Sequence, residues 1–138
     1  MPWAVLGLWV ATEGTGARML VGFLRRGGLR DEELAGGYLV TLIGNFTLGS
    51  ASLVPWVLHL VSGVPALAWA GAVQLLTTTV IGTVLALPWH RAHRRGRPTP
   101  EAGGAPAWPY HRWVEVGHGL LAWVTSGLAL AVAVGIST

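Results

Sequence analysis

The sequence predicts an all-α integral membrane bundle of four transmembrane helices, in one domain over residues 1–138. Only 11% of the residues are charged and 52% are hydrophobic, whereas soluble domains carry about 25% charged residues. The apolar residues form long runs at 36–61, 64–89 and 113–136. Each run exceeds the ~20 residues with which a helix crosses a hydrocarbon core. Most arginines lie beside or between these runs, as in loops that flank a membrane.

The first predicted span covers about 3–25. It begins with the apolar stretch MPWAVLGLWVA, which lacks the positively charged start of a signal peptide. The polar stretch RRGGLRDEEL follows as a loop of about 26–35, and its acidic end suits the first turn of the next helix.

The second and third predicted spans cover about 36–60 and 65–89, joined by a turn at VSGVP. The stretch HRAHRRGRPTPEAGGAPAWP then carries too many arginines, prolines and glycines for a helix in lipid, so it is predicted as a loop of about 90–112. The fourth predicted span covers about 113–136, which places both termini on the same side.

The distribution of arginine predicts the orientation. All nine basic residues are arginine, and the two long loops that contain most of them lie on one side of the membrane. The positive-inside rule makes that side cytoplasmic and the chain a multi-pass protein of the inner cell membrane. The pI near 10.6 is thereby explained without nucleic acid, which is not an expected partner. The chain has no cysteine, which excludes disulfides and thiolate metal sites.

Ionisable residues inside the spans are the strongest functional signal. A charge at the bilayer centre costs roughly 2.5–3.5 kcal/mol even on lenient scales, yet LWVATEGTGARMLVGFL carries Glu13 and Arg18. One interpretation is structural: Arg18 reaches the cytoplasmic headgroups and a protonated Glu13 bonds to Thr or Asn. The other is a polar pocket in the cytoplasmic leaflet, surrounded by Arg18, Asn45, Glu115 and His118. The two glycines of GTG would loosen the first helix near Glu13.

Further ligand-binding side chains are expected around this pocket, some within it and some at its mouth. They are Glu13, Thr79, Trp89, His90 and His111.

Glu115 and His118 form one E-x-x-H, which places both on one helix face. Di-iron bundles use two such motifs with two further carboxylates, so a di-iron site is not predicted here. A single metal ion at this motif is an alternative to an acid–base role, and no metal ligand is assigned. His118 is instead expected to act as acid or base, with Glu115 orienting it and Arg18 and Asn45 holding an oxyanion or carbonyl. No second histidine of the chain matches the depth of His118, so a haem would have to be shared with a partner subunit. The cofactor is left unassigned.

The C-terminal half also carries a family resemblance. The stretch LLTTTVIGTVLALPWHRAHRRG, followed by a polar loop and YHRWVEVGHGLLAWVTSGLALAVAV, resembles the small bacterial four-helix membrane proteins akin to the anthrone oxygenases. The residues that carry the likeness are Pro88, His90, His111, Arg112 and Trp113. The resemblance implies the four-helix fold and, more distantly, oxidoreductase chemistry. The first half lacks the proline-bearing segment that usually follows the first helix in that family.

Three functions are compatible with these features. The first is a membrane-embedded protein that binds or transforms a small apolar or aromatic molecule arriving from the bilayer. The second is an accessory subunit of a larger respiratory, photosynthetic or transport complex, or of a homo-oligomer, assembled through stripes of small residues such as Gly127, Ala131 and Gly135. The third is a proton or ion pathway through Glu13 and His118. Whether the chain is an enzyme is left open.

Overall fold

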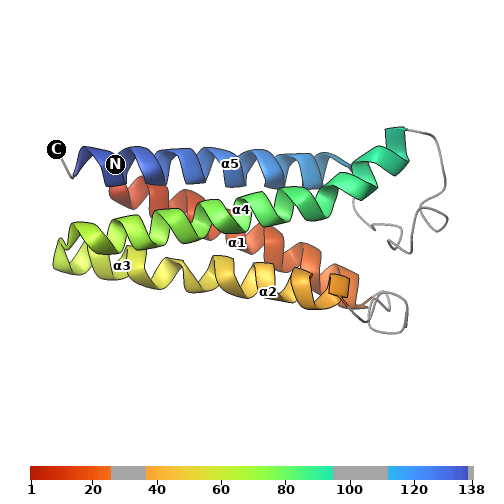
Figure 1. Cartoon of the computed structure of the whole chain (residues 1–138), viewed down its shortest axis with the longest axis horizontal. Helices are drawn as coiled ribbons and strands as arrows, with labels where there is room; N and C mark the ends of the chain where they lie inside the picture. The colour runs from red at the N-terminus through yellow and green to blue at the C-terminus, as the bar shows by residue number, and fades with distance from the viewer. Residues whose placement is uncertain (26–36, 95–111, 137–138) are drawn as a thin grey trace.

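The structure is a computed structural model that describes residues 1–25, 37–94 and 112–136 (Figure 1). It is helical in these ranges, without a strand. The elements are α1 (Pro2–Arg25), α2 (Gly37–Ala51), α3 (Leu53–Ser62), α4 (Pro65–Arg94) and α5 (Arg112–Gly135). The two predicted loops lie outside the described residues, apart from residues 90–94 and 112 of the second, which belong to α4 and α5.

Two helices differ from the predicted spans. The second span is divided at Ser52 into α2 and α3, because Pro55 has no backbone N–H to donate to the Ala51 carbonyl. The third continues through Arg94, beyond its predicted end at 89. Between α3 and α4 the chain reverses at Gly63, whose φ of 71° requires glycine and whose N–H donates to the His59 carbonyl at 2.8 Å.

The helices pack side by side as an antiparallel bundle. α1 contacts α5 and the α2/α3 pair, and α4 likewise contacts α5 and the α2/α3 pair. Across the described residues the backbone of α1 does not approach that of α4, and neither α2 nor α3 approaches α5 in this way, so these pairs lie diagonally. Both termini lie at the end that holds the α3–α4 turn (Figure 1).

Three helical segments are long and apolar enough to cross a membrane: Val40–Ser62, Pro65–Leu87 and Trp113–Gly135. α1 is not among them, because Glu13, Arg18 and the glycines lower its mean hydropathy. Large apolar side chains face outward along the bundle, with Val61 80% and Leu120 63% exposed. Such an outward apolar surface is what a hydrocarbon surrounding requires and is rare on a soluble monomer.

The half of the bundle near the termini has a solid core. Its centre is the pair Trp9 and Trp56, both fully buried, with ring centroids 5.6 Å apart. Alanines of α4 and α5 allow these helices to approach the indoles, and two larger residues complete the core. The remaining core residues are Val5, Ala68, Ala72, Leu75, Ala129 and Ala133.

A layer of buried hydroxyl groups follows toward the other end of the bundle. Thr12 of α1 and Thr125 of α5 bring their Oγ1 atoms within 3.3 Å. Thr79 of α4 and Ser126 of α5 make a hydroxyl–hydroxyl bond of 2.8 Å. Thr12 and Thr125 each donate to a carbonyl of their own helix, so their mutual contact is a packing contact, whereas an interhelical bond such as Thr79–Ser126 contributes about 0.6 kcal/mol in membrane bundles. The two contacts set the register of α5 against both neighbours.

Gly71 holds α4 close to α3, and its replacement tests that contact. A Cβ there would lie 3.2 Å from the Ser52 carbonyl oxygen and 3.2 Å from the Trp56 nitrogen, both backbone atoms. We expect Gly71→Val to lower stability by about 1–3 kcal/mol through overpacking. The control is Gly44→Val, where an added Cβ meets nothing within 4 Å. Thermal unfolding in detergent measures both, and equal midpoints would contradict the packing.

Candidate functional site

A cavity of about 370 Å³ occupies the half of the bundle away from the termini, between α1, α2, α4 and α5. Its volume lies within the range of roughly 300–1,000 Å³ that is usual for small-molecule sites. Most of its wall is apolar, with a few polar side chains. The polar and aromatic lining residues are Thr12, Glu13, Asn45, Phe46, Thr78, Thr79, Thr83, Glu115, His118 and Trp123.

One face of α5 supplies a wall of this cavity. Glu115, His118, Gly119, Ala122 and Trp123 all line it, and their spacing of three and four residues places them along one side of a helix. The rest of that face, nearer the termini, consists of the buried hydroxyl and alanine positions. The helix therefore changes from polar lining to packed core along a single stripe.

His118 is held by α1 through Thr15. The Thr15 hydroxyl donates to the Thr12 carbonyl at 2.8 Å, so its single proton is used. The contact of 2.8 Å between Thr15 Oγ1 and His118 Nδ1 then has the ring N–H as donor. This network assigns the proton of a neutral imidazole to Nδ1 and leaves the lone pair of Nε2 as an acceptor.

Gly16 makes room for this imidazole. A Cβ at Gly16 would lie 3.2 Å from His118 Cε1 and 3.7 Å from Nε2. α1 runs without interruption from Pro2 to Arg25, so the expectation that GTG loosens the helix is wrong. The stretch serves instead as a contact site, in which Thr15 binds the ring and Gly16 receives it.

Glu13 points from α1 toward α2. The Ser50 hydroxyl donates to Glu13 Oε2 at 3.0 Å. The other oxygen lies against Gly49, where a Cβ would approach Glu13 Oε1 to 2.7 Å. The carboxyl group is thus seated between two helices, which is how an ionisable group in an apolar segment avoids lipid.

Two buried oxygens of the cavity have no hydrogen-bond partner among the described residues, Asn45 Oδ1 and Glu115 Oε1. The Asn45 amide nitrogen lies close to α4, 3.3 Å from where a Cβ on Gly82 would stand. An unsatisfied buried oxygen costs roughly 1–3 kcal/mol. Two of them on one cavity indicate that a ligand or water normally supplies donors there.

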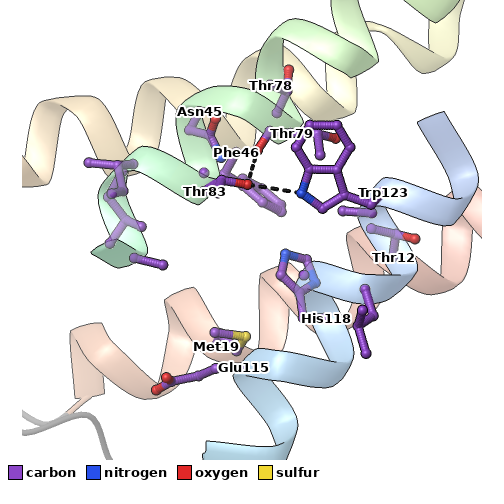
Figure 2. A pocket seen from close by; sticks show the side chains of 18 of the residues that line it. Thr12, Met19, Asn45, Phe46, Thr78, Thr79, Thr83, Glu115, His118 and Trp123 are labelled. Atoms are coloured by element: carbon purple, nitrogen blue, oxygen red, sulfur yellow. Dashed lines mark hydrogen bonds between the residues drawn. The ribbon is translucent and has the colours of Figure 1, made fainter. Parts of the chain in front are cut away.

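Trp123 closes the wall between α5 and α4. Its Nε1–H donates to Thr83 Oγ1 at 3.2 Å, and the Thr83 hydroxyl donates to the Thr79 carbonyl at 2.8 Å (Figure 2). The ring therefore has a defined orientation. Figure 2 shows His118 projecting from the same helix as Trp123, with Glu115 nearer the beginning of that helix.

The structure brings together most of the predicted pocket residues. Glu13, Asn45, Thr79, Glu115 and His118 all line the cavity. The Thr79 hydroxyl is engaged with Ser126, so this residue contributes wall rather than a free polar group.

The other predicted positions differ. Arg18 is exposed on α1 and is not among the lining residues, because five residues along a helix turn it well away from the face of Glu13. The partner of His118 Nδ1 is Thr15 and not Glu115. Trp89 and His90 belong to α4, but their side chains lie outside the described part, as does all of His111.

Sequence reasoning missed the residues that position the site: Thr15, Gly16, Gly49 and Ser50. Their side chains are small, and each is ordinary in a transmembrane segment. The one available signal was the adjacency of Thr15 and Gly16 to Glu13. The residues that these small side chains contact lie on other helices, and local sequence carries no record of those partners.

No group of three or more potential metal ligands occurs among the described residues. Comparisons with family models, with curated proteins and with solved structures give no match. The chemistry of the site therefore has to be inferred from its own atoms.

Replacing Gly16 tests whether His118 is seated against α1. Alanine in a helix is favoured over glycine by about 0.5–1 kcal/mol, and Gly14→Ala should show that gain, since its Cβ meets nothing within 4 Å. We expect Gly16→Ala to lose the gain, because its Cβ displaces the imidazole. Thermal unfolding of the two variants in detergent gives the comparison. A Gly16→Ala protein as stable as Gly14→Ala would place the ring elsewhere.

Proposed function

We propose that this chain is an integral membrane protein of four transmembrane helices, α1, the α2/α3 pair, α4 and α5, that binds a small, largely apolar molecule in its cavity. The observation that carries the proposal is the cavity itself, about 370 Å³, with the buried oxygens of Asn45 and Glu115 unpartnered among the described residues. A cavity kept merely as a packing defect would be dry and apolar. One that has polar groups at a few points is suited to orient a ligand.

Three features support the membrane assignment. Three helical segments are apolar enough to cross, and the outward surface of the bundle is rich in exposed valine and leucine. α1 is not among these segments, but it contacts both α5 and the α2/α3 pair and turns Glu13 inward to Ser50. The arginine-rich ends of the helices would face the cytoplasm of the inner membrane, which puts the cavity in the cytoplasmic leaflet.

His118 is the residue through which the bound molecule could also be transformed. Its Nε2 lone pair can take up a proton from a ligand in the cavity, and Thr15 would stabilise the resulting imidazolium through Nδ1. Arg18 has no part in this scheme, since it does not line the cavity. The oxidoreductase chemistry implied by the resemblance to the anthrone oxygenases stays a prediction.

Filling the cavity tests the binding function. Ala122 lines it, and Ala122→Leu should remove much of the space that a ligand would use. The control is Ala70→Leu, an exposed position on α4. After purification in mild detergent, native mass spectrometry and absorption spectra of the same peak should show a bound small molecule with wild type and Ala70→Leu. Its amount should fall at least tenfold with Ala122→Leu, and equal retention by all three would refute the assignment.

A second candidate, an assembly subunit, is favoured by the small-residue stripe Gly127, Ala131 and Gly135. All three are exposed on α5, and a Cβ added at Gly127 or Gly135 meets nothing within 4 Å. Small residues four apart let a further transmembrane helix approach closely. Ala68 and Ala72 of α4 are also small residues four apart, but they lie inside the bundle core.

Bulking that stripe separates assembly from binding. If the chain belongs to a complex or a homo-oligomer, Gly127→Leu and Gly135→Leu should each lower the amount of co-purifying polypeptide or the apparent mass on native gels. Neither substitution should affect ligand retention, because the stripe does not line the cavity. Unchanged mass and composition in both variants would leave ligand binding as the function.

A further inference from the structure

The hydrogen-bond donors of the cavity wall are largely engaged. Thr12 donates to the Leu8 carbonyl at 2.8 Å, and Thr78 donates to the Gln74 carbonyl at 2.9 Å. The Trp123 N–H is used by Thr83. Thr79 and Ser126 share one hydroxyl–hydroxyl bond, in which either residue can be the donor. Such hydroxyls and indoles offer little to a ligand that presents only acceptors.

The buried polar atoms of the cavity wall that have no partner among the described residues are acceptors. Asn45 Oδ1 and Glu115 Oε1 are buried and have no partner among the described residues. His118 Nε2 carries a lone pair, because the ring proton is on Nδ1, where it is donated to the Thr15 hydroxyl. A ligand that satisfies these atoms has to bring N–H or O–H groups.

The acidic side chains of the cavity wall give it a preference for positive charge. Two of its lining residues are carboxylic acids, Glu13 and Glu115, and no arginine of the described ranges lines it. A carboxylate in an apolar surrounding is stable only when it is compensated by a cation or a proton. A cationic ligand would supply the compensation that the described wall lacks.

The rest of the wall fits an apolar body with a positive end. Phe46 and Trp123 line the cavity together with Met19 and several leucines. Aromatic faces attract ammonium groups, by roughly 0.5–2 kcal/mol, and also accept hydrocarbon.

We propose that the cavity takes a protonated primary or secondary amine with an aromatic or aliphatic body, whose ammonium N–H groups are directed at the unpartnered acceptors. This inference rests on the proposed binding function and names the class of its ligand. A neutral hydrocarbon would leave the acceptors unsatisfied, and a carbonyl compound would face them with lone pairs. A quaternary ammonium would balance the charge but could not donate.

Four naphthalene derivatives of similar size test the proposal: 1-naphthylmethylamine, its N,N,N-trimethyl derivative, 1-naphthaldehyde and 1-ethylnaphthalene. Equilibrium dialysis of the full chain in detergent, against protein-free micelles, corrects for partitioning. We expect the amine to bind at least tenfold more tightly than the aldehyde and the hydrocarbon, with the trimethyl derivative intermediate. Ala122→Leu should abolish the protein-dependent binding of all four.

The decisive variants are Glu115→Gln and Glu13→Gln, which preserve shape and remove one carboxylate each. We expect Glu115→Gln to reduce the preference for the amine at least tenfold while hydrocarbon binding persists, and that persistence shows that the cavity is intact. Glu13→Gln provides a second reading should the first variant fail to fold. A preference for the amine that survives in both variants would overturn the proposal.

The outcomes also separate this inference from the proposed function. If 1-ethylnaphthalene or the aldehyde binds as tightly as the amine, the binding function stands and the amine class is wrong. If none of the four binds more to wild type than to Ala122→Leu, the binding function fails and the amine proposal fails with it.

Discussion

The hydrogen bond of 2.8 Å between Thr15 and His118 joins α1 to α5 at the level of the cavity. The imidazole lies so close to α1 that residue 16 has to be glycine, since a larger residue would occupy the place of the ring. It sets the tautomer of the imidazole, and through it the polarity of the atom that faces a ligand. The orientation of α1 about its own axis follows, and with it the inward direction of Glu13.

That orientation explains how polar side chains coexist with an apolar exterior. Hydrocarbon gives no hydrogen bonds, so each buried polar group has to find a partner within the bundle. Glu13 finds Ser50, and Thr79 finds Ser126. Three buried groups have no partner among the described residues: the Trp9 indole N–H in the packed core, and Asn45 Oδ1 and Glu115 Oε1, which both border the cavity. A ligand in the cavity would bind to these two oxygens rather than to the groups that already have partners.

The two halves of the bundle differ in what fills them. Near the termini the indoles of Trp9 and Trp56 occupy the interior, against alanines that let the helices close around them. Toward the other end glycine occupies the interior positions 16 and 82, and a cavity remains between the helices. The break at Ser52, forced by Pro55, lies between the two halves. α2 therefore packs along the cavity half, and α3 packs along the half that holds the tryptophan core.

The sequence by itself determined the helices and their apolar character, because runs of ~20 apolar residues and the arginine clusters are local properties. It also indicated Asn45, Glu115 and His118 as residues of a polar site, because a polar side chain in an apolar run is costly unless it faces the interior of the bundle. Which of these groups meet was decided by the tertiary structure. Arg18 left the predicted site because the rotation of α1 is set by its contacts with other helices. Glu115 was predicted to orient His118, but Thr15 is the partner of the imidazole. Thr15 is 103 positions away in the chain, and only helix packing brings it near His118.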